Sequence, residues 1–188
     1  MSVESTESPV AEQEICVKCG ICCDGTLFNH AELEPGEMSS GSLPKKIEQN
    51  YRKMGEKERF VLPCQYFEGK CTIYDQNRAI VCSAFRCQLL KDFSKGRITK
   101  YDADKTVLNA LKFRNEIFEL YKRIFGVDTK LSFRQLLTEI GKMPVPPAEQ
   151  SKELALLKAQ CNIYETLLIK NFKSIKTFKS MIDTTVEQ

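Results

Sequence analysis

The sequence contains no tryptophan, a single histidine, and no run of about 18 apolar residues of the kind that crosses a membrane. Its opening segment, MSVESTESPVAEQE, has four Glu but neither Lys nor Arg, which is the opposite of a secretory signal or a transit peptide. The second residue is Ser rather than Gly, which excludes N-myristoylation. These absences predict a cytoplasmic protein, without a membrane span, whose thiols stay reduced.

A strong charge of either sign is also absent. The chain has 28 basic and 25 acidic side chains, for a net charge of +3. The segment IKNFKSIKTFKS interleaves lysines with apolar residues, at Lys170, Lys173, Lys176 and Lys179. Four charges make a weak electrostatic footprint, so we interpret this segment as a solvated lysine face beside a buried aromatic face. The charge pattern therefore argues against a nucleic-acid partner.

Cysteine, by contrast, is abundant, with nine residues in a chain of 188. Eight of them fall into two groups along the sequence: Cys16, Cys19, Cys22 and Cys23, followed by Cys64, Cys71, Cys82 and Cys87. In a reducing compartment, clustered thiols bind metals or do redox chemistry more often than they form a disulfide scaffold. The ninth, Cys161, lies on an apolar helical stripe and is interpreted as a small buried hydrophobe.

The sequence divides into three parts. Residues 1–14 are predicted to be a disordered acidic tail, residues 15–98 a cysteine-cluster metal-binding domain, and residues 99–188 a helical C-terminal region. Within the second part, we expect a short exposed helix over residues 45–60 and a β-hairpin over residues 64–74, turning at Glu68 and Gly69. A helix with a bend between Cys82 and Cys87 should follow.

The C-terminal part is predicted to be helical from Asp102, with a short helix that ends at Gly141 and a break at MPVPP. The last helix, from about Ala148, carries a stripe at three- and four-residue steps: Leu154, Leu157, Cys161, Tyr164, Leu168, Asn171, Ile175, Phe178 and Ile182. We expect this stripe to pack against the helix of residues 107–125; the alternative is a protein partner. The predicted fold class is mainly α with a small β-hairpin, in which a metal-nucleated N-terminal domain precedes a helical hairpin or bundle.

Several thiolates lie close together at low cost only when a cation stabilises them. Cys16, Cys19 and Cys22 form the Cys-x-x-Cys-x-x-Cys run of ferredoxins, although the chain continues with Cys23-Asp24 rather than Cys-Pro. The spacing also suits a zinc knuckle, and eight thiolates suit two zinc ions, two cubane clusters, or one cluster with spare cysteines. The only histidine, His30, is interpreted as a loop residue.

The adjacent Cys22 and Cys23 project in different directions on ordinary backbone. They are therefore better placed to serve two metal positions, or a cluster and its surroundings, than a single ion. The position of Cys23 is where one site ends and a second can begin.

The elements CVKCGICC and C…YFEGKCTIYDQNRAIVCSAFRC resemble the CxxCxxCC cysteine-cluster family, described as zinc- or iron-chelating. The resemblance covers residues 16–87 and implies that the eight cysteines there are the metal-binding residues. Two positions depart from the family pattern: Ala79 stands where Pro usually follows the Arg, and Ser83 where an Arg often follows the Cys. One branch of the family is similar to flagellin lysine N-methylase, which uses S-adenosylmethionine and an iron–sulfur cluster.

Two functions follow as expectations. The first is a metal-binding accessory module that holds an iron–sulfur cluster, with 4Fe–4S favoured, or zinc, and docks on a protein through its C-terminal helices. The alternative is an iron–sulfur-dependent protein-modifying enzyme, such as a protein lysine N-methyltransferase, or a redox protein. Asp24, Tyr74 and Asp75 are acid–base candidates beside the cysteines, but they form no recognisable catalytic pair. No glycine-rich nucleotide-binding loop follows a strand.

Overall fold

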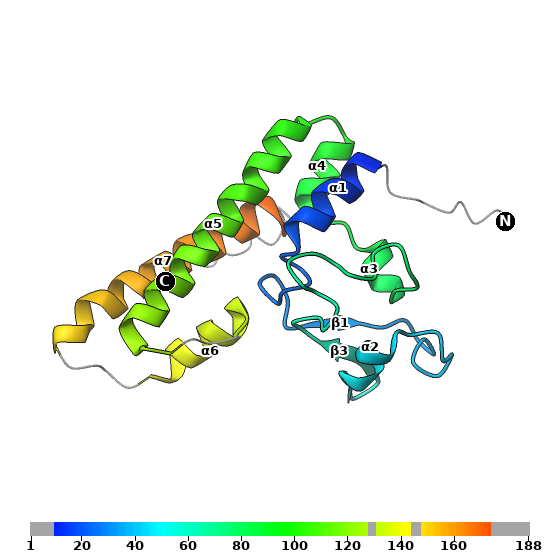
Figure 1. Ribbon diagram of the computed structural model, residues 1–188, viewed down its shortest axis with the longest axis horizontal. Helices are drawn as coiled ribbons and strands as arrows, with labels where there is room; N and C mark the ends of the chain where they lie inside the picture. Colours follow the sequence, from blue (N-terminus) through cyan, green and yellow to red (C-terminus); the bar gives the residue numbers. More distant parts are fainter. Residues whose placement is uncertain (1–9, 128–130, 144–147, 174–188) are drawn as a thin grey trace, which may run out of the picture.

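The computed structural model describes residues 10–127, 131–143 and 148–173, which form a mainly helical protein with one small antiparallel sheet (Figure 1). The predicted class, mainly α, is confirmed. The described helices are α1 (Val10–Cys19), α2 (Lys45–Gln49), α3 (Ile80–Ala84), α4 (Gln88–Ser94), α5 (Lys100–Phe125), α6 (Phe133–Lys142) and α7 (Ala148–Asn171). The strands are β1 (His30–Glu32), β2 (Tyr51–Met54) and β3 (Lys57–Val61). None of these helices is both long and apolar enough to cross a membrane.

The helix α5 is the longest element, and its two ends are defined by local sequence. Thr99 and Asp102 form a capping box, in which the backbone N–H of Asp102 donates to Thr99 Oγ1 at 3.1 Å and Thr99 N–H donates to Asp102 Oδ2 at 3.2 Å. At the other end Gly126 takes a left-handed conformation, which glycine adopts without steric cost. These signals fix α5 close to the range that periodicity predicts.

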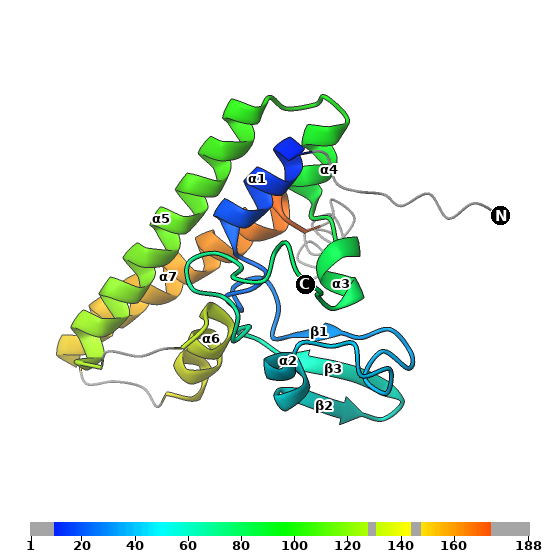
Figure 2. The same cartoon turned by 45° about the vertical axis from the view of Figure 1, so that its right-hand side comes forward.

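The helix α7 packs along α5, as Figures 1 and 2 both show. The residues of its apolar stripe within the described range are buried in the larger core: Leu154, Leu157, Cys161, Tyr164 and Leu168. The prediction that the stripe packs within the chain is confirmed for these residues. Asn171 is half-buried, and Ile175, Phe178 and Ile182 lie outside the described residues.

The helices α1 and α4 pack against each other and against α5 (Figure 2). Residues 10–14, predicted to belong to a disordered tail, are instead the first half of α1. Glu12 is only 1% exposed and forms an ion pair with Arg86 at 3.4 Å, so a partner distant in sequence stabilises this helix. Residues 1–9 of the predicted tail lie outside the described range.

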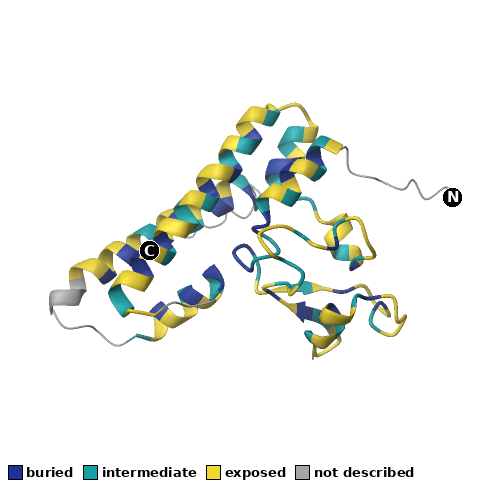
Figure 3. Ribbon diagram, viewed as in Figure 1, coloured by how far each residue is buried: buried dark blue, intermediate teal, exposed yellow. Residues whose placement is uncertain are grey.

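The sheet has the strand order β1-β3-β2, with all neighbours antiparallel. In the register of the sheet, His30 of β1 pairs with Val61 of β3, and Tyr51 of β2 pairs with Phe60 of β3. The helix predicted for residues 45–60 is therefore wrong beyond Gln49, because the chain forms a hairpin that turns at Gly55 with φ of 64°. This hairpin buries Phe60 with Leu33, Ile47 and Leu62 in a second, smaller core, visible as dark ribbon around the sheet in Figure 3.

Two further segments concern the later cysteines. The hairpin predicted for residues 64–74 is reduced to a single bridge between Phe67 and Cys71, closed by a turn at Gly69 with φ of 74°. The predicted bend between Cys82 and Cys87 is confirmed, since α3 ends at Ala84 and Cys87 is the N-cap of α4.

Candidate metal centre

Six of the eight predicted ligand cysteines line one cavity of about 370 Å³ between α1, the sheet and α3. These six are Cys16, Cys22, Cys23, Cys64, Cys71 and Cys82. Most of the remaining wall is apolar, and includes Phe28, Phe60, Leu62 and Phe85. The other two, Cys19 and Cys87, do not line the cavity and instead pack with Cys22 against the larger core.

A tight turn after α1 brings the first cysteines together. The backbone N–H of Gly20 donates to Cys16 O at 3.2 Å, and the N–H of Cys23 donates to Gly20 O at 2.8 Å. Gly20 has φ of 60°, a conformation that favours glycine. The ring of Phe67 rests against it so closely that a Cβ at this position would lie 2.2 Å from Cε2. This turn reverses the chain, so that Cys22 and Cys23 lie close to the end of α1.

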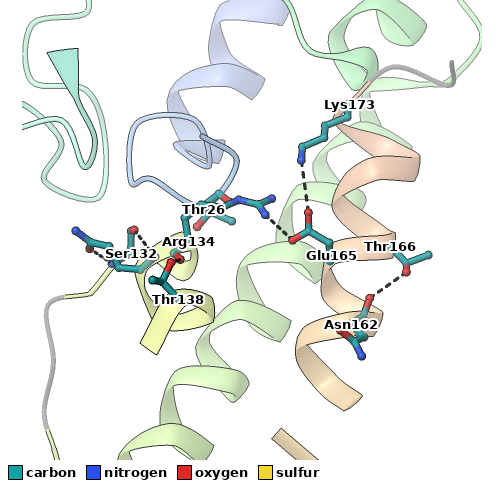
Figure 4. Close-up of polar contacts among 9 residues, drawn as sticks. Thr26, Ser132, Arg134, Thr138, Asn162, Glu165, Thr166 and Lys173 are labelled. Carbon is teal, nitrogen blue, oxygen red and sulfur yellow. Dashed lines mark hydrogen bonds and ion pairs between the residues drawn. The ribbon is translucent and has the colours of Figure 1, made fainter. Parts of the chain in front are cut away.

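The segment after the turn is fastened to the C-terminal helices by two arginines. Asp24 accepts a hydrogen bond from Thr26 N–H at 2.8 Å and forms an ion pair with Arg114 of α5. Arg134 of α6 donates from Nε to Thr26 O at 3.0 Å and from Nη1 to Glu165 Oε2 at 2.7 Å (Figure 4). The helical region therefore positions the loop that carries Cys22 and Cys23.

Lys173 approaches the same carboxylate from the end of α7, with its Nζ 3.5 Å from Glu165 Oε1 (Figure 4). Glu165 thus lies between two cations, and both side-chain oxygens have a partner. This arrangement joins α6, α7 and the loop around Thr26 into one polar network.

The second group of cysteines reaches the cavity from two segments. The N–H of Cys64 donates to Cys23 O at 2.7 Å, which joins the two sequence groups directly. The guanidinium of Arg78 lies over the ring of Tyr74, 4.2 Å from its centroid, and both residues line the cavity. The charge of Arg78 favours thiolate formation there, since it acts to lower the pKa of Cys16 and of Cys82, and Lys46 acts in the same way on Cys64.

Desolvation by the surrounding protein is the largest influence on the acidity of these thiols, although Cys16 and Cys82 are exposed at the surface. Desolvation raises the pKa of Cys82 to about 12 and that of Cys87 to about 11, and it also raises the pKa of Cys16, Cys19, Cys23 and Cys64. For Cys22 burial is again the largest cause of a raised pKa, followed by the charges of Cys87, Cys19 and Cys23. Without a bound cation these thiols are therefore protonated at neutral pH, and a metal would have to displace their protons.

The cysteines share one cavity but form no coordination sphere. Among residues 10–127, 131–143 and 148–173, no three Cys, His, Asp or Glu side chains are arranged so that they could hold a metal ion. Ligation would therefore require the thiols to turn toward a common centre. The donor set itself suits zinc or iron–sulfur clusters, because soft thiolates bind these in preference to Ca²⁺ or Mg²⁺.

Two further predictions concern one cysteine and one histidine that are not among the eight predicted ligands. Cys161 is 2% exposed within the core shared by α5 and α7, which confirms the interpretation as a buried hydrophobe. His30, predicted to lie in a loop, is instead the first residue of β1 and lines the cavity.

Sequence reasoning missed the arginines that surround the site. Arg78 follows the Cys-x-Ile-Tyr element, but its charge alone does not reveal that it lines the same cavity as Cys16. Arg114 and Arg134 look like ordinary helix-surface residues, and only their packing shows that they hold the loop of Asp24 and Thr26.

Comparison of the chain with protein-family models, with curated proteins and with solved structures finds no match.

Proposed function

We propose that the protein binds a thiolate-coordinated metal centre, an iron–sulfur cluster or zinc, through the eight cysteines of residues 16–87. The observation that carries the proposal is that six cysteines from distant parts of the sequence line the same cavity. Thiols with no chemical task have no reason to converge from α1 and the turn after it, from the segment between β3 and α3, and from α3 itself. A metal supplies that reason, since it stabilises the deprotonated sulfurs and crosslinks the segments.

The choice between the two centres rests on local sequence and burial. The run Cys16-x-x-Cys19-x-x-Cys22 is the arrangement that wraps cubane clusters in ferredoxins, which favours 4Fe–4S. Apolar side chains such as Phe28 and Leu62 line the cavity, and an apolar surrounding tunes the potential of a cluster. A structural zinc site would use the same sulfurs without redox activity.

The best-supported role is an accessory or binding module of the cytoplasm, where unliganded thiols stay reduced. Docking of a protein on the C-terminal helices stays a prediction, because the described part of the α7 stripe packs on α5. An iron–sulfur-dependent protein-modifying enzyme is the second candidate. The cavity favours it in one respect, since its volume is that of a small-molecule site and Tyr74 and Arg78 offer polar groups within it.

The test is metal analysis of the full chain purified without oxygen, combined with its absorption spectrum. Iron and acid-labile sulfide in equal amounts, with a broad visible band, are expected for a cluster. Stoichiometric zinc in a colourless protein would select the zinc centre. A folded protein that takes up neither metal, even after reconstitution with iron, sulfide or zinc, would overturn the proposal.

A further inference from the structure

We propose that the eight cysteines form two separate four-thiolate sites whose members are not the two groups seen in the sequence. The first site consists of Cys16, Cys19, Cys22 and Cys87. The second consists of Cys23, Cys64, Cys71 and Cys82. This inference rests on the proposed function and adds the number of centres and the ligands of each.

The first set is assembled by the contact between α1 and α4. Cys16 and Cys19 are three residues apart on α1 and therefore share a face of that helix. Cys87 is the N-cap of α4, which packs on α1. Cys19, Cys22 and Cys87 all contact the larger core, which the helices form.

The second set is assembled on the sheet side. The hydrogen bond from Cys64 N–H to Cys23 O places these two residues side by side. Phe67 N–H donates to Cys64 O at 3.0 Å and Phe67 also bridges Cys71, so a single short turn carries Cys64 and Cys71. Cys82 lies on α3 next to Val81, which packs with Cys64 against the smaller core. All four members of this set line the cavity.

The adjacent Cys22 and Cys23 have different neighbours. Cys22, like Cys19 and Cys87, packs against the larger core, whereas Cys23 O accepts the hydrogen bond from Cys64 N–H. Cys16 lies at the boundary, since it lines the cavity together with the second set. Its position on the same face of α1 as Cys19 assigns it to the first set.

Cys23 and Cys87 distinguish this arrangement from a grouping by sequence. In a grouping by sequence Cys23 would belong with Cys19, and Cys87 with Cys64. In the structure the two are exchanged, since Cys87 lies with Cys19 against the larger core and Cys23 is hydrogen-bonded to Cys64. The two groupings make opposite predictions for pairs of substitutions.

Two double variants of the full chain form a matched test, since each removes two thiols and keeps Cys19→Ser in common. Metal and sulfide per chain are measured after anaerobic purification. We expect Cys19→Ser/Cys87→Ser to lose half of the wild-type metal, because both changes fall in one site. Cys19→Ser/Cys23→Ser should lose nearly all of it, because each site loses a ligand. The reverse pattern, or complete loss in both variants, would overturn the division into these two sites.

A measurement on the wild-type chain covers the case in which a variant fails to fold. Metal-free protein is given one equivalent of zinc, its free thiols are alkylated, and the modified cysteines are mapped by mass spectrometry. We expect the protected cysteines to fall in complete sets, either the four of the first site or the four of the second, and a second equivalent to protect the rest. Protection of a mixed set, or saturation at one zinc, overturns the two-site arrangement alone. Absence of any protection overturns the proposed function as well.

Discussion

Arg114, in the middle of α5, forms an ion pair with Asp24, the residue that directly follows Cys22 and Cys23. The side chain of Asp24 is only 12% exposed, and burial raises its pKa even though the Arg114 charge acts to lower it. The longest helix thus stabilises a carboxylate that would otherwise be poorly solvated beside the cysteines.

Replacing this arginine should destabilise the protein. We expect Arg114→Ala to lower the free energy of unfolding by about 2 kcal/mol, less than for a fully buried pair because Arg114 is partly exposed. The loss should be largest at neutral pH and shrink in acid, because a protonated Asp24 no longer needs a cation. Denaturant unfolding at several pH values measures both effects. The control is Arg123→Ala, which removes the exposed ion pair of Arg123 with Glu153 at 3.9 Å. This variant should change the free energy of unfolding by less than about 0.5 kcal/mol. Equal losses in the two variants would contradict the prediction.

Gly20 should tolerate no side chain. It combines φ of 60° with contact against the Phe67 ring, so Gly20→Ala is expected to cost more than the roughly 1–2 kcal/mol of a left-handed alanine. Gly69→Ala is the matched control, since Gly69 has φ of 74° but open space around it. Thermal unfolding compares the two, and adding Phe67→Ala to Gly20→Ala should recover part of the difference. The steric explanation fails if both glycine variants lose the same stability.

Arg134 should matter more than its place on a helix surface indicates. Arg134→Met removes the bonds to Thr26 O and Glu165, and we expect a loss of about 3 kcal/mol because Glu165 is left with Lys173 alone at 3.5 Å. Proteolysis of the native protein should also reach the loop around Thr26 faster, since its tether to α6 is gone. Lys142→Met, on the same helix with a highly exposed side chain, is the control. Unchanged protease sensitivity would show that Arg134 does not hold the loop.

Cys161 should be independent of the metal. Cys161→Ala is expected to keep the full metal content while costing about 1 kcal/mol, because it leaves a small cavity in the core between α5 and α7. Elemental analysis and thermal unfolding measure the two quantities. Loss of metal in this variant would make Cys161 a ligand.

Metal binding should release protons and weaken as the pH falls. Desolvation raises the pKa of Cys87 to about 11, and it also raises the pKa of Cys82, so these thiols enter the reaction protonated at neutral pH. A site of four thiolates should release about four protons per zinc. Calorimetric titration in buffers of different ionisation enthalpy counts them. Zinc uptake without proton release would mean that the thiols do not ligate it.

The helical half of the fold could be predicted from the sequence because its signals are local. The stripe on α7 has helical spacing, and α5 and α6 begin at capping boxes formed by Thr99 and Ser132. The helix that the sequence predicts over residues 50–60 is wrong: the many charged residues there favour a helix, whereas burial of Phe60 and pairing of β3 with β1 decide the outcome. That pairing depends on a strand distant in sequence.

The candidate site likewise has one part that local sequence predicts and another part that depends on contacts between distant segments. The identity of the eight predicted ligands is read from cysteine spacing, yet their partition depends on contacts such as Cys64 with Cys23 and α1 with α4. The helix α1 itself escaped prediction because its stability comes from Ile15 and Glu12 packing against later parts of the chain. Sequence spacing cannot show which thiols meet across such contacts.

The packing of α1 against α4 and α5 also sets an order of events during synthesis. When Cys16, Cys19, Cys22 and Cys23 leave the ribosome, neither of the helices that fix α1 has been made. The surface that holds these sulfurs exists only after α5 has emerged, since domains generally fold as units. The packed surroundings of these four cysteines are therefore complete only once translation has passed residue 125, long after the cysteines themselves have been made.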